Sequence, residues 1–132
     1  MKKVVFSMLL VIMGVIGVCA ATQTVATKSI SVTSGGAVTY TNLSASYDTA
    51  RVMADPTSIT SGTKKQKFIG YLNSSGTLTN KKSATGTLYT NACTLVTIGT
   101  IGKGKWYIVD QAFDGSTDYA GWSGTLTIQS VS

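Results

Sequence analysis

The sequence predicts a small antiparallel β-sandwich or jelly roll of about eight strands, which follows a cleaved apolar helix at the N-terminus. Three observations favour this all-β class. Beyond residue 21, no segment repeats its apolar residues at the spacing of a helix. Short runs alternate between apolar and polar residues, and clusters of Gly, Ser, Asn and Asp separate them. Many short strands with turns between them are typical of a sandwich.

The clearest strand pattern lies in the segment Gly104–Ser130. In its first half, Trp106 and Ile108 fall on one face of an expected strand. In its second half, Leu126 and Ile128 alternate with threonines, which indicates a strand with one buried face. We therefore expect these two halves to be the closing strands of the sandwich, with Trp106 in its core.

Two alternating runs come first in the chain. Ser29–Thr33 and Ala37–Thr41 are separated by Ser34-Gly35-Gly36, and a glycine pair lets the backbone take positive φ. The pattern predicts a short hairpin between the two runs. The residues before them, Thr22–Lys28, form a flexible or edge-pairing arm in this interpretation.

The middle of the chain supplies the remaining strands. Arg51–Ala54 is expected to end at Asp55-Pro56, because proline cannot donate to a ladder. Phe68–Leu72 is apolar on both faces, which predicts a central strand. The other expected strands are Thr77–Thr79 and Gly86–Thr90, on either side of a polar tip that contains Lys81 and Lys82, and then Cys93–Ile98.

The C-terminal pattern resembles the end of known secreted modules. Gly104-x-Trp106-x-Ile108-Val109, a Gly/Asp turn, and then Trp122-x-Gly124-x-Leu126-x-Ile128 are similar to the last strands of the pre-peptidase C-terminal domain and of the proprotein convertase P domain. This resemblance implies a jelly roll. The acidic, calcium-associated strand of such modules has no counterpart upstream, so the resemblance carries over no functional residue.

Residues 1–20 have the pattern of a secretory signal peptide. Lys2 and Lys3 precede an uncharged run from Val4 to Val18, and small residues follow it. The run is shorter than the roughly 20 residues of a membrane span. We expect cleavage after Ala20, a single β-sandwich domain over residues 21–132, no stable membrane span after processing, and a secreted, extracellular or cell-surface location.

Processing leaves a single cysteine. Cys19 departs with the leader, so Cys93 has no partner for a disulfide within the chain. We expect Cys93 to be a small buried apolar residue, and the alternative is a reactive or intermolecularly paired thiol. Because Val18 precedes Cys19 where a small residue is needed, lipidation of Cys19 is not expected.

Composition excludes several classes of protein. The net charge of +6 falls to +4 without Lys2 and Lys3 (6 − 2 = 4), and Arg51 is the only arginine, which is unlike a nucleic-acid binder. The chain has no histidine, and its five acidic residues are all aspartates. Catalytic triads with histidine and histidine-ligated zinc sites are therefore impossible. We expect no enzyme activity.

One short segment suggests a metal site. Asp110, Asp114, Ser116 and Asp118 place hard oxygen ligands close together, as a Ca²⁺ loop requires. The segment lacks the later bidentate acid of such a loop, and aspartate and serine are common turn residues. We expect turn caps and no cofactor, with calcium as the alternative.

Aromatic and basic side chains are the candidates for ligand binding. Tyr119 and Trp122 lie beside a glycine-rich turn and are the better candidates for an exposed ring that contacts a glycan, with Tyr107 as a third candidate. The alternative for these rings is packing in the core or at a strand edge. Other rings that can be exposed are Tyr47, Tyr71 and Tyr89.

Seven lysines lie near the expected turns. They form a basic patch if the turns share one end of the sandwich, and otherwise they protect strand edges from pairing with another chain. These residues are Lys64, Lys65, Lys67, Lys81, Lys82, Lys103 and Lys105.

These observations predict a secreted, non-catalytic β-sandwich. It either binds an extracellular glycan or cell-wall polymer, or it assembles with itself as an adhesion or filament subunit through the Thr22–Lys28 arm. The alternative is a small, basic antagonistic or membrane-active protein similar to a toxin or bacteriocin.

The leader generates a test of processing. Exported protein should begin at Ala21 or Thr22 when its N-terminus is sequenced, because small residues precede that bond. An intact Met1 on exported protein would contradict the signal peptide.

Overall fold

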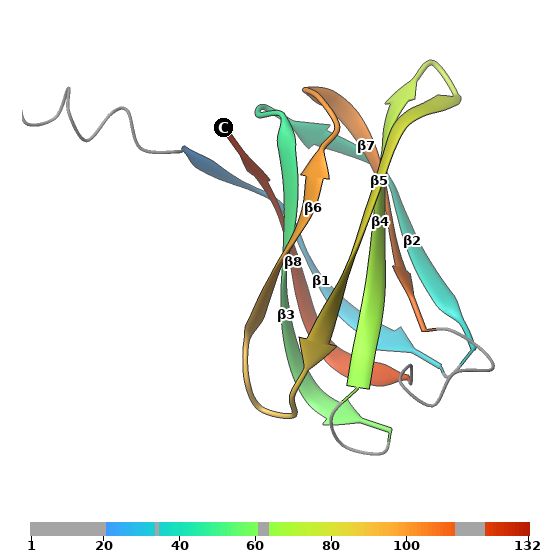
Figure 1. Ribbon diagram of the computed structural model, residues 1–132, viewed down its shortest axis with the longest axis vertical. Helices are drawn as coiled ribbons and strands as arrows, with labels where there is room; N and C mark the ends of the chain where they lie inside the picture. Colours follow the sequence, from blue (N-terminus) through green and yellow to red (C-terminus); the bar gives the residue numbers. More distant parts are fainter. Residues whose placement is uncertain (1–20, 34, 61–63, 113–120) are drawn as a thin grey trace, which may run out of the picture.

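The computed structural model describes residues 21–33, 35–60, 64–112 and 121–132, and they form eight strands in two layers (Figure 1). The expected helix at the N-terminus lies outside the described residues. The strands are β1 (Thr22–Val32), β2 (Ala37–Ala45), β3 (Thr49–Ile59), β4 (Lys64–Ser74), β5 (Thr77–Leu88), β6 (Thr94–Thr100), β7 (Gly104–Gln111) and β8 (Trp122–Val131).

The strand order is that of a jelly roll. One sheet has the order β1-β8-β3-β6 and the other the order β2-β7-β4-β5, and every pairing is antiparallel. The predicted fold class is therefore confirmed. The predicted hairpin between Ser29–Thr33 and Ala37–Thr41 is wrong, because β1 and β2 belong to different sheets. Turn residues show that the chain reverses, but not whether it crosses to the other sheet.

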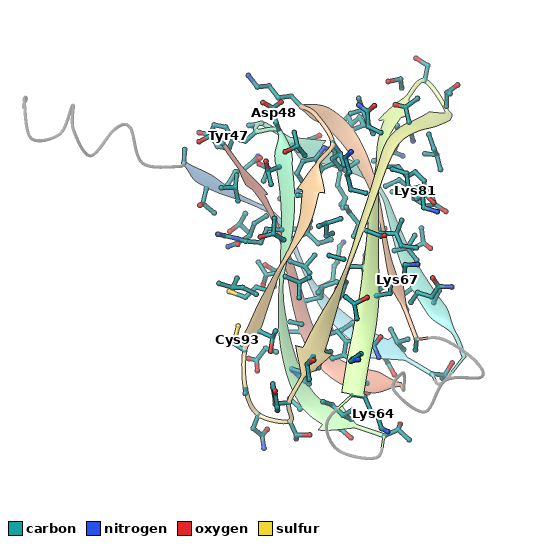
Figure 2. The ribbon with its side chains drawn as sticks, viewed as in Figure 1. Tyr47, Asp48, Lys64, Lys67, Lys81 and Cys93 are labelled. Carbon is teal, nitrogen blue, oxygen red and sulfur yellow. The ribbon has the colours of Figure 1, made fainter. Side chains whose placement is uncertain are left out.

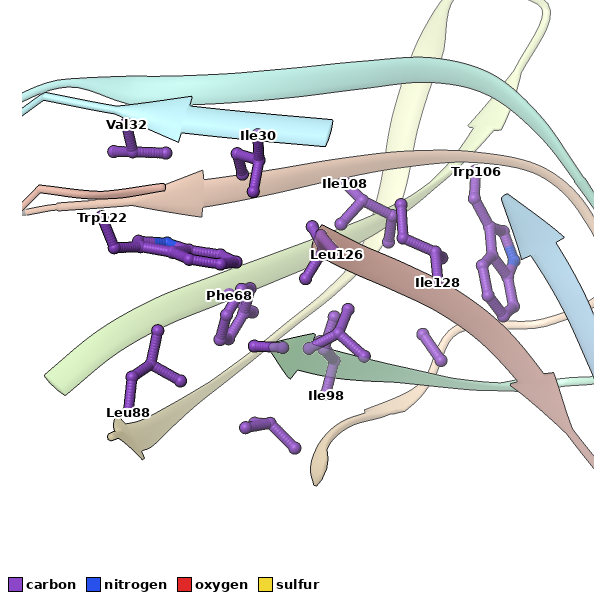
Figure 3. Close-up of a cluster of buried hydrophobic side chains, with 14 of the residues drawn as sticks. Ile30, Val32, Phe68, Leu88, Ile98, Trp106, Ile108, Trp122, Leu126 and Ile128 are labelled. Carbon is purple, nitrogen blue, oxygen red and sulfur yellow. The ribbon is translucent and has the colours of Figure 1, made fainter. Parts of the chain in front are cut away.

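The core lies between the sheets and is built from the alternate residues of each strand (Figure 3). Trp106, Phe68, Leu126 and Ile128 have no exposed surface, which confirms the predicted position of Trp106. The indole Nε1 of Trp106 donates to the carbonyl of Gly102 at 2.7 Å, so its polar edge is satisfied. β4 is an inner strand of its sheet, as Phe68–Leu72 predicted.

β3 continues through Pro56, where the sequence predicted that it ends. Its pairing with β6 stops at Ala54, so Pro56 has no bond to lose on that side. On the other side Pro56 lies opposite Gly124, directly before a register shift. A proline is tolerated at such a bulge.

β5 is one continuous strand, where a polar tip between two strands was expected. Most of its residues are exposed, because β5 is the edge of its sheet. An edge strand has fewer apolar neighbours, so polar residues such as Lys81 and Lys82 fit within it.

All four edge strands carry an extra residue that interrupts their ladder. Register shifts place these residues in β1 at Thr24/Ala26, in β2 between Tyr40 and Leu43, in β5 opposite Gly70/Leu72, and in β6 opposite Ala50/Arg51. In β2 and β5, Asn42 and Asn80 have φ of 56° and 54°. Bulges of this kind twist an edge away from flat pairing with another chain.

No helix among the described residues has the length and apolar character needed to cross a membrane.

The close approach of β3 and β8 generates a stability prediction. A Cβ at Gly124 would lie 2.2 Å from the carbonyl oxygen of Asp55 and 2.8 Å from the Cα of Pro56. Gly124→Ala should therefore lower the free energy of unfolding by roughly 1–3 kcal/mol or more, since the backbones must separate. Thr125→Ala, at an exposed neighbouring position, should change it by about 0.5 kcal/mol or less. Equal effects of the two changes in urea unfolding would show that the contact is not tight.

Candidate functional site

The outer faces of the two sheets consist of the residues that alternate with the core. On β4 and β7, the residues between the buried Phe68, Trp106 and Ile108 point away from the core. We call this outer surface of the β2-β7-β4-β5 sheet the β4–β7 face, with Tyr71 and Tyr107 at its centre.

Tyr71 and Tyr107 lie directly opposite each other on the two inner strands of the sheet. Their ring centroids are 5.6 Å apart and the ring planes meet at 80°, an edge-to-face contact. Both side chains are half-buried. An edge-to-face pair leaves one ring with an exposed flat side when nothing covers it, so the pair is a candidate surface for an apolar ligand face.

Apolar and hydroxyl side chains surround the tyrosine pair. Ile69 and Val109 form the next cross-strand pair, and Ile69 is 9% exposed although it is not part of the core between the sheets. Thr39 on β2 and Ser83 on β5 extend this row to both edges, and both are exposed. The face therefore has an apolar centre with hydroxyl groups at its margins.

The lysines of the predicted basic patch do not gather at one end of the sandwich. Lys65, Lys67 and Lys105 lie on the β4–β7 face by their alternation along β4 and β7. In Figure 2, Lys67 and Lys81 both extend from the side formed by β4 and β5.

Two other lysines of that patch lie elsewhere. The aliphatic stem of Lys82 lies over Gly99 of β6. Lys103 is exposed in the connection between β6 and β7. The patch is therefore only partly assembled in the structure.

Trp122 is not exposed, so it is wrong as a candidate for a ring that contacts a glycan. Its side chain is 2% exposed, and it points inward at the start of β8 opposite Val32 and Ile59. The glycine-rich neighbourhood suggested a turn, but Trp122 already belongs to the strand, in phase with Leu126. Tyr119 lies outside the described residues, and Tyr107 is on the β4–β7 face.

The sequence named Tyr71 only among the rings that can be exposed, and not as a residue of the candidate site. It predicted a central strand that is apolar on both faces, and this hid the difference between the faces. The signal was present in the alternation itself, since Phe68, Gly70 and Leu72 share one face and Ile69 and Tyr71 the other.

Asp110 is buried and joins the two sheets. It points inward from β7 with no exposed surface, and its Oδ2 accepts a hydrogen bond of 2.7 Å from Nε1 of Trp122 on β8. Its other oxygen, Oδ1, has no hydrogen-bond partner among the described residues. Burial raises the pKa of Asp110 from 3.8 to about 7, and the Trp122 hydrogen bond partly opposes the rise.

The negative charge of Asp110 also affects a tyrosine on the neighbouring strand. The pKa of Tyr40 on β2 is raised, first by burial and then by the negative charge of Asp110. Asp110 and Tyr40 therefore belong to one partly polar region inside the sandwich.

The expected metal loop is only partly described. Asp114, Ser116 and Asp118 lie outside the described residues. Asp110 belongs to β7 and points into the sandwich. Within the described part of the chain, no three acidic or cysteine side chains lie close enough to hold a metal ion.

Cys93 is exposed, so its prediction as a buried apolar residue is wrong. It precedes β6, an edge strand, and lies in the connection from β5 (Figure 2). Its apolar neighbours in sequence suggested a buried strand, but Leu95 in β6 is itself 57% exposed.

A shallow cleft opens on the other sheet, near the end where Trp122 lies. Its volume is about 270 Å³, and Trp122 contributes to its wall. The other lining residues, mostly hydroxyl-bearing, are Ser31, Val32, Thr33, Ser58, Thr60, Gly121 and Ser123. The cleft has no charged group among its described lining residues.

Comparisons with known proteins show the fold class alone. No family model matches the chain, and no curated protein matches it. The exo-β-1,3-galactanase from Phanerochaete chrysosporium, with galactose, aligns with 83% of this chain and 29% of its own, at 11% identity and a TM-score of 0.52. A variant of that enzyme with β-1,3-galactotriose aligns with 83% of this chain and 26% of its own, at 12% identity and a TM-score of 0.53.

This chain therefore spans less than a third of those galactanase chains. A carbohydrate-binding module, CBM36 in complex with calcium and xylotriose, aligns with 85% of this chain and 92% of the module, at 12% identity. Its TM-score is 0.46. The jelly roll that the C-terminal pattern implied is supported, whereas the pre-peptidase and P-domain families are not.

The buried carboxylate generates a prediction about pH. Because folding raises the pKa of Asp110, the folded state holds this proton more tightly than the unfolded state. The resulting stability is complete below about pH 4 and is lost as the pH rises through about 7. The free energy of unfolding should fall by roughly 2–4 kcal/mol between about pH 4.5 and pH 7.5, at 1.36 kcal/mol per pKa unit.

Asp110→Asn is the matched control, because its amide oxygen can still accept from Trp122 and has no charge to bury. Urea unfolding of this variant should show a flatter dependence on pH than the wild type. The same slope in both proteins would show that Asp110 does not titrate in the folded state.

Proposed function

We propose that this chain is an exported, non-catalytic β-sandwich that binds a polysaccharide across the β4–β7 face. The observation that carries the proposal is the pair of half-buried tyrosines, Tyr71 and Tyr107, side by side at the centre of an otherwise mixed sheet surface. The carbon-bound hydrogens of a sugar ring form an apolar face that packs on an aromatic ring. Hydroxyl side chains at the margins, such as Thr39 and Ser83, supply donors and acceptors for sugar hydroxyls.

The simpler role of the tyrosine pair is to stabilise the sheet, since aromatic cross-strand pairs contribute about 0.2–1 kcal/mol. That role explains the contact between the rings. It does not explain the adjoining Ile69–Val109 pair on the same outer surface, which extends the apolar area along both strands. Ile69 is buried and Val109 is partly buried, so the tyrosine pair is the part of this strip that a ligand can reach.

The structure favours glycan binding over self-assembly. The Thr22–Lys28 arm, which the assembly hypothesis needs for a neighbour's sheet, lies in β1 and pairs with β8 from Thr22 onward. Each edge strand is also interrupted by an extra residue, which opposes addition of another strand. No feature of the described residues favours the membrane-active alternative.

The absence of histidine and glutamate from the sequence supports a non-catalytic role, since two common general acids or bases are missing. The part of each galactanase that aligns with this chain is less than a third of the enzyme chain, so the activity of those enzymes does not transfer to this domain. Export is supported by the pattern of residues 1–20.

The proposal predicts the effect of removing both rings. Tyr71→Leu with Tyr107→Leu keeps apolar bulk on the face and removes the flat rings. This double variant should bind at least about tenfold more weakly than the wild type to the polysaccharides that retain the wild type in a pull-down screen, a loss of about 1.4 kcal/mol or more.

Tyr89→Ala is the matched control, because Tyr89 is 51% exposed and follows the end of β5 that pairs with Lys64, seven residues along β4 from Tyr71 (71 − 64 = 7). It should leave retention unchanged. Unchanged retention of the double variant, with melting temperatures that show both variants folded, would remove the tyrosine pair from the site. If no insoluble polysaccharide or isolated cell wall retains the wild type, the proposed function fails.

A further inference from the structure

We propose that two copies of this chain pack face to face as a symmetric dimer, through the outer surface of the β1-β8-β3-β6 sheet. We call this outer surface the β3–β8 face. It lies on the opposite side of the sandwich from the β4–β7 face, so the inference does not depend on the proposed function. Its basis is the arrangement of charged and apolar side chains on β3 and β6.

The β3–β8 face carries almost no charge. Of the residues in its four strands, only Lys28, Arg51 and Asp55 are charged. Lys28 lies opposite the buried Leu126, and its ζ-amino group lies 5.9 Å from the ring centroid of Tyr40 on β2, so it leaves the sheet on the inner side. The face therefore has one positive and one negative charge, whereas the chain without residues 1–20 carries +4 (6 − 2 = 4).

The two charges lie on β3 at equal distances from an apolar pair. Met53 is two residues from Arg51 and two from Asp55, and the residues in between are buried, so these three side chains share the outer face. Met53 is half-buried and lies directly opposite Leu95 of β6, whose side chain is 57% exposed. Arg51 and Asp55 are four residues apart (55 − 51 = 4), which is about 13 Å at about 3.3 Å per residue.

Short hydroxyl side chains cover the β1 and β8 part of the face. They form cross-strand pairs, Thr27–Thr127, Ser29–Thr125 and Ser31–Ser123. Stacked sheets pack at a distance of about 10 Å, which short side chains permit. In these four strands Arg51 is the only long charged side chain on the outer side, so little keeps a second sheet away.

A twofold axis through the position of Met53 makes this face complementary to itself. When the axis lies between the two sheets and at right angles to β3, the strand of the second copy runs in the reverse direction. Arg51 of each copy then faces Asp55 of the other, and Met53 and Leu95 meet their own counterparts. A symmetric dimer of this kind uses the same patch on both subunits.

The Arg51 guanidinium is held in place for this pairing. Its Nε donates to Oε1 of Gln129 on β8 at 2.8 Å. The two Nη groups carry the remaining donors, and a carboxylate can accept two parallel bonds from such a planar group. Asp55 is exposed, so its carboxylate is accessible to a second copy.

The exposure of Leu95 alone does not indicate an interface, because single apolar residues are common on protein surfaces. The distribution of charge is what favours a second copy. Two copies with the same positive net charge repel each other on their basic sides, and they can approach on a neutral face whose charges are mutually opposed. The bulged edges oppose assembly by strand addition, but a contact between faces uses no edge.

The size of the face suits a weak dimer. Its four strands, at about 4.8 Å each, and about eight residues, at about 3.3 Å each, cover roughly 500 Å² on each copy. The total of about 1,000 Å² is near the lower limit for a specific interface, so we expect dimerisation at micromolar concentrations. In this dimer the two β4–β7 faces point outward in opposite directions.

Sedimentation velocity measures the dimer directly. We expect the weight-average mass to rise from one copy toward two between about 1 and about 500 μM, at about 0.15 M salt. The mass of one copy at every concentration would overturn the inference.

Charge reversal tests the pairing of Arg51 with Asp55. Arg51→Asp alone and Asp55→Arg alone should each weaken the dimer at least about tenfold, because each contact then joins like charges. The two variants mixed in equal amounts should associate within about threefold of the wild-type affinity, because each contact again joins opposite charges. Lys103→Asp is the matched control, since it makes the same change in net charge as Arg51→Asp at an exposed position outside the face, and it should leave the dimer unchanged.

Leu95→Lys tests the apolar centre of the contact. The side chain is already exposed in the single copy, so the melting temperature of the dilute protein should stay unchanged. The dimer should be lost, because the two introduced ammonium groups would face each other across the axis. This variant and Asp55→Arg keep the test complete if Arg51→Asp lowers the melting temperature.

Four results would overturn the inference. A loss in Lys103→Asp equal to that in Arg51→Asp would reduce the association to net charge. A dimer that survives Leu95→Lys and both charge reversals uses another surface. Folded charge variants that do not associate when mixed would exclude the proposed symmetry. A polysaccharide that binds the β3–β8 face of a monomeric protein would make this face a ligand surface. Failure of the polysaccharide pull-down with an intact dimer would affect the proposed function alone.

Discussion

The packing of Trp106, Ile108 and Phe68 between the two sheets determines what the rest of the molecule can present. A strand alternates its side chains with a period of two, so burying Trp106 and Ile108 turns Tyr107 and Val109 outward. Burying Phe68 and Gly70 turns Ile69 and Tyr71 outward in the same way. A slip of one residue would exchange the core for the β4–β7 face, and the core strongly opposes such a slip.

A second contact between the sheets has a cost. The Asp110 carboxyl group is desolvated inside the sandwich and accepts one hydrogen bond, from Trp122. An apolar residue of similar size would remove that desolvation cost, although it would leave the indole N–H without its acceptor. The Asp110–Trp122 bond links β7 of one sheet to β8 of the other. We infer that it contributes to the relative position of the sheets more than to the free energy of unfolding.

The sequence predicted the fold class and much of the core because both depend on alternation within a strand. Trp106, Leu126 and Ile128 are buried as their phase predicted. Sheet membership could not be predicted, because a Gly-rich turn between β1 and β2 is equally compatible with a hairpin and with a crossing to the other sheet. The exposure of Cys93 was missed for a related reason, since an edge strand such as β6 can keep apolar residues such as Leu95 in solvent.

The candidate site was only partly visible in the sequence. Tyr107 was identified, but its partner Tyr71 comes from a strand that lies 36 residues earlier (107 − 71 = 36), and only the antiparallel register brings the rings together. Trp122 was misplaced because its neighbours are turn residues, while its own phase belongs to the core. The lysines were expected to form a basic patch only if the turns that carry them share one end, whereas the register distributes Lys67 and Lys105 along one face.

The edge strands are interrupted by bulges, and the proposed binding surface is the tyrosine-centred face of one sheet. The central claim is the location of that surface. Amide chemical shifts, followed by NMR while a retained oligosaccharide is added, test it most directly. The account predicts that the largest changes cluster on β4 and β7 around Tyr71 and Tyr107. Changes confined to β1, β3 and β8, on the opposite sheet, would contradict it.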